Sequence, residues 1–288
     1  MRIAVNHSTT YTYSDVVRLQ PHVFRLRPRS EGALRLLQFA LRIEPSPIRF
    51  SEYIDLEGNC VGHAWFDGFT DRLYVESSFE IETERLNAFD YLLEPDAQTL
   101  PLRYPKDLES RVAPYCSREA NHNDVDEFAC RIADLAQGRT LEFLQVLGAQ
   151  VHKECQRIVR EEGPPQPAAI TLRQRRGSCR DLAVLFMDAC RVFNIGARFV
   201  SGYQRHGRDP KRRYMHAWAE VYLPGGGWRG YDPTHAVAVA DAHVAVAASR
   251  EPVGASPIEG AFVGAQVSST MKACVKILNL DQSTHEGG

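Results

Sequence analysis

The sequence predicts an α+β protein in which a β-rich first part precedes a unit of helices followed by strands. In the first 83 or so residues, short stretches alternate between apolar and polar side chains, and turn-forming clusters separate them. From about residue 122, apolar residues recur at spacings of three and four, the period of an amphipathic helix. Alternation then returns after residue 196. Strands, then helices, then strands is the order expected of the α+β class.

Strand patterns at 2–7, 36–43 and 73–81 predict an N-terminal β-sandwich domain over residues 1–90. Residues 91–121 follow as a Pro-rich crossover linker, because proline fixes φ and interrupts regular hydrogen bonding. The linker contains four prolines, Pro95, Pro101, Pro105 and Pro114.

A second domain is expected over residues 122–288. Its predicted helices cover 125–133, 140–159 and Cys179 to about Asn194, with Gly196 as the residue that ends the third helix. Its predicted strands cover 197–203, 215–223, 228–231, 242–248, 261–267 and 271–280.

Composition excludes several functional classes. The 288 residues are 44% hydrophobic and 24% charged, as in ordinary globular proteins, and the net charge is −2. That charge gives no reason to expect nucleic acid or an anionic membrane as partner. No run approaches 18 apolar residues, so no membrane span is expected. Met1 to Tyr13 has no basic, apolar and small-residue succession, and it reads as a strand rather than a signal peptide. A cytoplasmic location is the default expectation.

The seven cysteines are odd in number and contain no CxxC pair. This argues against a disulfide framework and against a structural zinc site, so no metal and no cofactor are expected. Free cysteines in such a chain are usually small buried apolar residues. Cys179 has a different context from the other six.

Cys179 stands where a helix is predicted to begin. Ser178 and Asp181 form a capping signature directly before an apolar helical pattern, which makes Cys179 the first helical residue. Unpaired N–H groups at a helix start stabilise a thiolate, the nucleophilic form of cysteine. Gly177 would leave room for a substrate carbonyl near the Cys179 N–H. The simpler alternative is a buried cysteine without a role, as expected of Cys190.

His216 and Asp232 occupy the two strands of a predicted hairpin. Residues 215–223 alternate, with His216 on the face opposite the more apolar one, and the turn-rich 224–227 connects them to a strand that ends at Asp232. The two residues can therefore be cross-strand neighbours, with the carboxylate orienting the imidazole. Separately, each has an ordinary explanation: an incidental histidine, and a turn initiator before Pro233.

Four segments, Gly177–Ala183, Ala197–Tyr203, His216–Tyr222 and Gly230–Thr234, closely resemble the bacterial transglutaminase-like family of predicted cysteine proteases. Residues 21–28 and 89–95 also look like the amino-terminal β domain of this family and its connection. The resemblance implies a papain-like core over 122–288, with Cys179 as nucleophile, His216 as base and Asp232 as orienting residue. Members often have Asn after Asp-Pro-Thr, where this chain has His235, which affects fine positioning.

These residues predict acyl transfer through a thioester on peptide or amide substrates. The resemblance favours hydrolysis, as by a cysteine protease or amidase, and the triad itself does not choose between water and an amine as acceptor. Three alternatives stay open: an amine-accepting transglutaminase, a peptide-binding protein with a vestigial triad, and a metal site made by Cys179, His216 and Asp232. The expected partner is a peptide or protein substrate. Nothing predicts the oligomeric state.

Three further features have weaker claims. Gln174 is a candidate side-chain donor to the oxyanion, although a solvated loop residue is the commoner case. Trp218 could line a substrate groove together with Gly177, although such aromatic residues usually pack in the core. The basic run Arg205–Arg213 precedes His216 and could rim the site and favour acidic substrates, or be a solvated loop.

Overall fold

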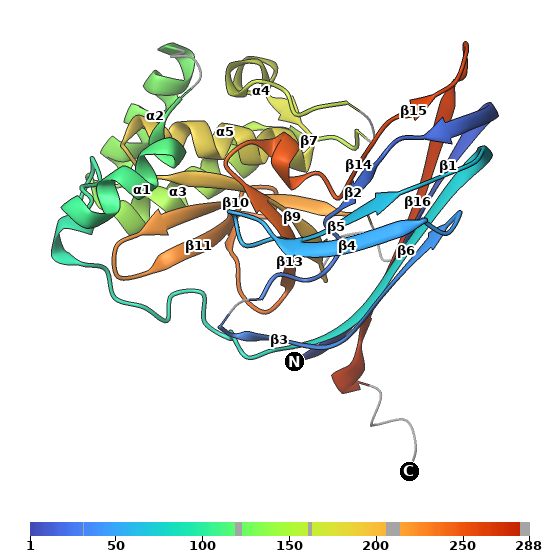
Figure 1. Cartoon of the computed structure of the whole chain (residues 1–288). Helices are drawn as coiled ribbons and strands as arrows, with labels where there is room; N and C mark the ends of the chain where they lie inside the picture. The colour runs from blue at the N-terminus through green and yellow to red at the C-terminus, as the bar shows by residue number, and fades with distance from the viewer. Residues whose placement is uncertain (31, 119–122, 161–162, 206–213, 283–288) are drawn as a thin grey trace.

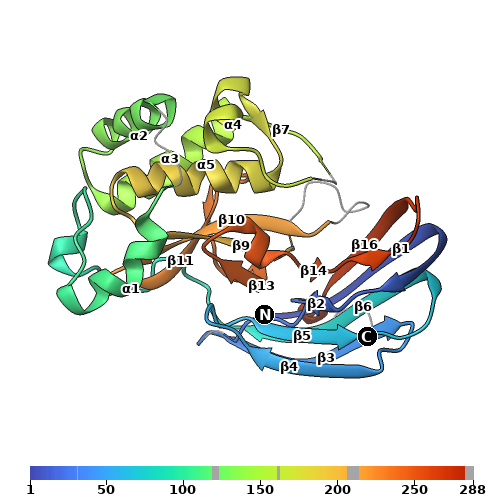
Figure 2. The ribbon, with the colours of Figure 1, turned by 45° about the horizontal axis from the view of Figure 1, so that its top comes forward.

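The computed structural model describes residues 1–288 except 31, 119–122, 161–162, 206–213 and 283–288. Helices form one layer, a central sheet forms the second, and the N-terminal β strands lie on the far side of that sheet (Figures 1 and 2). The predicted α+β class is confirmed. Among the described residues, no helix is long and apolar enough to cross a membrane.

The N-terminal β unit contains two sheets. In the first, β1 lies between β6 and β16, with β3 beyond β6 and β15 against the end of β1. The second has the order β14-β2-β5-β4. The strands are β1 (Arg2–Leu19), β2 (His22–Phe24), β3 (Leu34–Glu44), β4 (Arg49–Ile54), β5 (Cys60–Trp65), β6 (Thr70–Thr83), β14 (Ile258–Glu259), β15 (Phe262–Val263) and β16 (Ser269–Asn279).

The C-terminal strands belong to this unit, which differs from the predicted domain boundaries. β16 pairs antiparallel with β1 from Ile3↔Asn279 to Tyr13↔Ser269, and β14 pairs with β2. The predicted 122–288 domain is therefore split, since its last strands complete the sheet of residues 1–90. Alternation identifies a strand, but it does not say which sheet that strand joins.

The central sheet has the order β12-β11-β10-β9-β13. Its strands are β9 (Ala197–Gln204), β10 (His216–Leu223), β11 (Gly227–Asp232), β12 (Val237–Ala238) and β13 (His243–Ser249). The helices are α1 (Lys106–Cys116), α2 (Asn123–Leu135), α3 (Thr140–Glu154), α4 (Ala168–Gln174) and α5 (Cys179–Val192), and a short parallel pair is formed by β7 (Gln156–Arg157) and β8 (Arg176–Gly177).

The crossover at 91–121 contains a helix that the prolines concealed. Pro105 stands directly before the first residue of α1, where its missing N–H removes no intrahelical hydrogen bond. Beside α1, the Tyr104 hydroxyl donates to the Tyr222 carbonyl (2.9 Å) and accepts the Gly196 N–H (2.8 Å). The segment is thus a packed part of the second unit.

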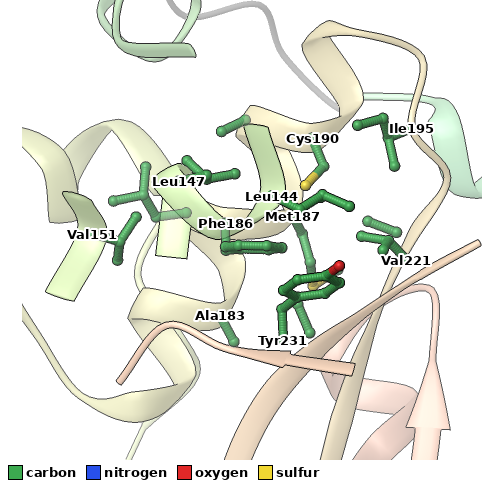
Figure 3. Packing of buried hydrophobic residues seen from close by; sticks show 14 of the residues in the cluster. Leu144, Leu147, Val151, Ala183, Phe186, Met187, Cys190, Ile195, Val221 and Tyr231 are labelled. Carbon is green, nitrogen blue, oxygen red and sulfur yellow. The ribbon is translucent and has the colours of Figure 1, made fainter. Parts of the chain in front are cut away.

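Helix α5 is the centre of the larger core (Figure 3). Phe186 stacks on Tyr231 of β11, with ring centroids 5.7 Å apart, and Leu144 and Leu147 of α3 pack against the same helix. Cys190 is fully buried there, as expected of a cysteine without a chemical role. Packing on several sides fixes the position of the N-terminus of α5, and therefore of Cys179.

The other face of the central sheet is covered by the N-terminal β unit. Tyr203 of β9 packs with Ile3 and Phe79, and the polar contacts between the units are also buried. The Tyr203 hydroxyl lies 2.9 Å from His7 Nδ1, and Asn59 bonds with both backbone groups of Ala248 at 2.8 Å. Both faces of the central sheet are therefore buried, one by the helices and the other by the N-terminal β unit.

Candidate active site

The N-terminus of α5 has the capping geometry that the sequence predicts. Asp181 Oδ2 accepts the Ser178 N–H (2.7 Å) and the Ser178 hydroxyl (2.8 Å), and Cys179 is the first helical residue. Asp181 is completely buried, and its other oxygen accepts the Gln166 N–H at 2.7 Å and a hydrogen bond from Arg160. One carboxylate thus fixes both the helix start and the segment that precedes it.

His216 and Asp232 meet across the hairpin. The register Ala219↔Tyr231 brings Asp232 opposite Trp218 and diagonal to His216, the first residue of β10. His216 Nε2 donates to Asp232 Oδ2 at 2.8 Å, and the two residues are 6% and 1% exposed. The expected contact between them is therefore present, along the diagonal of the ladder.

Cys179 completes the arrangement from the helix side. Its sulfur hydrogen-bonds with His216 and accepts the backbone N–H of Ala217. Because Nε2 of His216 faces Asp232, Nδ1 is the nitrogen left for the sulfur. Cys179 is partly exposed, whereas the two residues behind it are buried, so the thiol is the accessible end of the chain of hydrogen bonds.

The electrostatics favour a charged pair. Burial acts to lower the pKa of His216, but the Asp232 carboxylate and the Cys179 sulfur outweigh it and raise that pKa to about 10. Burial acts to raise the pKa of Cys179, but its hydrogen bond with His216 and the charges of His216 and Arg180 lower it below the ordinary thiol value. A thiolate next to an imidazolium is the expected resting form at neutral pH.

The structure adds two histidines that the sequence reading did not assign. His235 Nδ1 (2.8 Å) and His243 Nε2 (3.0 Å) also contact Asp232 Oδ2, so three imidazoles share one oxygen. We call Asp232, His216, His235 and His243 the Asp232 cluster. Burial alone would raise the pKa of Asp232, but these histidines hold it well below its usual range. A histidine directly after Asp-Pro-Thr was the available sequence signal, whereas His243 is brought in by β13, a distant strand.

The cluster has metal-ligating residue types. His216, Asp232 and His243 each offer a ligand atom, all within 4.8 Å of one another among the described residues. However, the imidazole nitrogens converge on the carboxylate oxygen at hydrogen-bond distances, rather than on a shared central point. Cys179 is not in this group, so the reading of Cys179, His216 and Asp232 as a metal site has no support in this geometry.

Two predicted site residues have other roles. Trp218 is 1% exposed and packs with Val200 and Ala245 beneath the N-terminal unit, so it cannot line an open groove. Gly177 is buried, and a Cβ there would lie 2.8 Å from the Cβ of Asp181. The absence of a side chain at Gly177 therefore leaves space for Asp181, whereas the sequence analysis expected it to leave space for a substrate carbonyl.

The predicted roles of Gln174 and of the basic run Arg205–Arg213 stay predictions. Gln174 is the last residue of α4, and its side chain is exposed, five residues before Cys179. In the basic run Arg205–Arg213, positions 206–213 lie outside the described residues. A cleft of about 750 Å³ between the crossover, α3 and the segment after β11 has Asp232 in its wall and is otherwise mostly apolar, as at Leu86, Phe89 and Val237.

Comparisons with known proteins agree with this architecture. The family described as the bacterial transglutaminase-like N-terminal region matches residues 3–82, and the transglutaminase-like superfamily matches residues 128–233. An uncharacterized protein of Mycobacterium leprae is 28% identical over 91% of this chain and 94% of its own length. One of Mycobacterium tuberculosis is 24% identical over 96% of this chain and 92% of its own.

A solved structure extends the likeness to the whole fold. The crystal structure of a "putative cysteine protease" from Cytophaga hutchinsonii superimposes with a TM-score of 0.70 at 20% identity, covering 97% of this chain and 91% of that one. Both units of the present chain therefore have counterparts in one solved protein. The chain thus matches, in order, the bacterial transglutaminase-like N-terminal region and the transglutaminase-like superfamily, and it shares the fold of the solved protein.

Proposed function

We propose that this protein is a cysteine-dependent hydrolase of peptide or amide bonds, with Cys179, His216 and Asp232 as its catalytic triad. One observation carries the proposal. A partly exposed cysteine at a helix N-terminus hydrogen-bonds with a buried histidine, whose other nitrogen lies 2.8 Å from a buried carboxylate. Nucleophile, base and orienting group in this order are the parts that thiol acyl transfer requires.

In the proposed reaction, the Cys179 thiolate attacks the substrate carbonyl and forms a tetrahedral oxyanion. His216, protonated at Nδ1, gives that proton to the departing amine as the C–N bond breaks, which leaves a thioester on Cys179. A water molecule then loses a proton to His216 and attacks the thioester, releasing the carboxylic acid and restoring the thiolate. Asp232 keeps Nε2 of His216 protonated, and so presents Nδ1 to the sulfur and the substrate.

The oxyanion needs donors close to the sulfur. The backbone N–H of Cys179 is one, and two glutamines are candidates for a side-chain donor. Gln166 is tied to the start of α5, because its backbone N–H donates to Asp181, and its side-chain amide Nε2 could supply the donor. The exposed Gln174 is the alternative that the sequence indicates. Gln166→Ala and Gln174→Ala form a matched pair, and loss of a true oxyanion donor lowers turnover by about 10²-fold or more.

Alkylation by iodoacetamide at pH 6 tests the proposed pair without a known substrate. Ordinary thiols react slowly at this pH, because little thiolate is present. We expect mass spectrometry to show modification of Cys179 first, and its loss in His216→Ala. The exposed Cys130 and Cys274 serve as internal controls, because they are accessible and stand outside the Asp232 cluster.

Uniform slow labelling of all accessible cysteines would remove the catalytic proposal and favour a peptide-binding protein with a vestigial triad. If Cys179 is selectively labelled, a screen of peptide substrates with and without an added primary amine distinguishes the acyl acceptors. Hydrolysis products in both conditions support the hydrolase. Amide products that appear only with the amine would instead identify a transglutaminase.

A further inference from the structure

Asp232 is held by more donors than a triad needs. Its Oδ2 accepts from His216, His235 and His243, and its Oδ1 accepts the Thr234 N–H at 2.9 Å. A carboxylate has about four acceptor positions, two on each oxygen, so three imidazoles on Oδ2 are more than that oxygen has positions for. Two of the three imidazoles have no place in the proposed reaction, and their contacts need an explanation.

His243 reaches the carboxylate from a different strand. It is the first residue of β13, is 7% exposed, and pairs across the sheet with Gln204 of β9. His216 comes from β10, and His235 comes from the turn after β11, three residues beyond Asp232. Contacts from β13 and from the local turn therefore fix the carboxylate plane independently of His216.

The far side of His243 indicates which nitrogen carries its proton. His243 Nδ1 and Trp218 Nε1 are buried and have no hydrogen-bond partner among the described residues, and the two rings are 5.1 Å apart. Both residues line one cavity of about 20 Å³, which is enough for a single water molecule. A water there can accept the indole N–H and donate to Nδ1. That leaves the proton of a neutral His243 on Nε2, where it donates to Asp232.

We propose that His243 is a positioning residue of the active site: as a neutral imidazole held by Trp218 through one water, it fixes the Asp232 carboxylate in the orientation that His216 needs. This inference rests on the proposed triad function. Because His243 is neutral, it supplies a hydrogen bond without competing for the charge that Asp232 provides to His216. His235 supplies the second fixed contact on the same oxygen.

Burial supports the neutral form of His243. Burial lowers the pKa of His243, and the charges of His216 and His235 lower it further, against the opposing effect of Asp232. The charged groups that face it are these three residues and, across the small cavity, Glu220 and Arg85. A neutral His243 therefore adds no positive charge that would compete with His216 for Asp232.

The first experiment uses the wild-type protein and needs no substrate. Two-bond ¹H–¹⁵N correlation NMR at pH 7 reports the tautomer of each histidine. We expect His243 to be neutral, with its proton on Nε2. In Trp218→Phe we expect the Nδ1 resonance of His243 to shift, because the bridging water loses the indole N–H that it accepts. A proton on Nδ1, or a charged His243 at pH 7, would overturn the proposal whether or not the triad is catalytic.

The second experiment measures the pH profile of Cys179 alkylation in His243→Phe and His243→Gln. Phe keeps the ring and loses the donor, so we expect about tenfold slower alkylation at pH 6 and an alkaline limit about one pH unit lower. Gln places an amide N–H near the Nε2 position and should restore most of the profile. His22→Gln is the matched control, because His22 is also buried but lies in the N-terminal unit.

The possible outcomes are distinguishable. A folded His243→Phe with the wild-type profile would refute the positioning role while leaving the triad intact. If His243→Phe does not fold, the His243→Gln profile and the tautomer measurement decide the question. If Cys179 of the wild-type protein is not labelled in preference to the other cysteines, the triad itself is refuted. Stoichiometric Zn²⁺ binding that blocks alkylation of Cys179 and is lost in His243→Gln would overturn the positioning role and indicate a metal site instead.

Discussion

Two buried histidines in this molecule show opposite behaviour. His216 lies next to a carboxylate and a thiolate, and these charges overcome burial and raise its pKa to about 10. His7, in the interface between the two units, has the hydroxyls of Tyr203 (2.9 Å) and Thr9 (3.1 Å) as its hydrogen-bond partners in the described part of the chain. Burial lowers its pKa to about 4. The same side chain is thus a cation in the candidate active site and neutral in the interface, because only the first has negative charges beside it.

The two sites make stability depend on pH in opposite directions. The raised pKa of His216 gives stability that is complete below the unfolded value of 6.5 and is lost as the pH rises through about 10. The lowered pKa of His7 means that the unfolded chain binds more protons between pH 4 and 6.5, so stability falls as the pH drops through this range. A stability maximum between these two losses follows.

The largest expected effect comes from removing the charge beside His216. Asp232→Asn keeps the shape of the side chain, so the pKa of His216 should fall toward the behaviour of His7 and the pKa of Cys179 should rise. We expect alkylation of Cys179 at pH 6 to slow by roughly 10²–10³-fold. The pH profile of iodoacetamide labelling measures this, with Cys130 as the internal reference. An unchanged profile would mean that Asp232 does not control the pair.

Acid unfolding tests the neutral histidine of the interface. Protonating His7 should remove about 3 kcal/mol of stability between pH 6.5 and 4, from the size of its pKa shift. Urea unfolding at a series of pH values measures the loss, and His7→Gln corrects for the carboxylates that titrate in the same range. Equal acid sensitivity in the wild type and in His7→Gln would show that His7 is not the responsible group.

The same interface contains a buried amide whose loss should affect stability alone. Asn59→Ala removes both partners of the Ala248 backbone N–H and C=O, each bonded at 2.8 Å, and should cost about 2 kcal/mol. Selective labelling of Cys179 should persist, because Asn59 has no contact with the Asp232 cluster among the described interactions. Denaturant unfolding and labelling of the same sample separate the two effects. A loss of labelling in the folded variant would show that the interface controls the site.

The smallest expected change is at the hydroxyl that faces His7. Tyr203→Phe keeps the buried ring and deletes the hydrogen bond to Nδ1 of His7, which should cost about 1 kcal/mol. The variant also removes the hydrogen-bond partner of His7 Nδ1 and adds no negative charge. The pKa of His7 should therefore not rise. Thermal unfolding at pH 7, repeated at pH 5, gives both quantities. Stabilisation by the variant would contradict the role of this bond in joining the units.

Local chemistry made the start of the site predictable from sequence. Ser178 and Asp181 specify a helix start through backbone contacts three residues apart, so the position of Cys179 follows from neighbouring residues alone. The hairpin likewise sets His216 against Asp232 through a short turn. The predicted end of α5 was less accurate. The left-handed residue after the helix is Asn194, with φ of 57°, rather than Gly196, because Asn also tolerates this conformation.

Residues brought from distant segments could not be predicted in this way. His243 reaches Asp232 because β13 pairs with β9, and Trp218 is buried because Val200 of β9 and Ala245 of β13 pack against it. Neither fact has a signal in the neighbouring residues. For the same reason, the sequence wrongly placed the strand at 271–280 in the second domain, whereas β16 pairs with β1 in the first sheet. The pattern of a strand does not identify its partner strand.

The pairing of β16 with β1 also affects how the protein is made. β1 leaves the ribosome well before β16, which follows about 250 residues later, or roughly 10–50 s of synthesis. Until then one edge of a long strand has open backbone groups, which are a template for pairing with other chains. Recombinant yield should therefore depend on holdase chaperones, and a fragment that ends before residue 258 should aggregate even if its catalytic half folds.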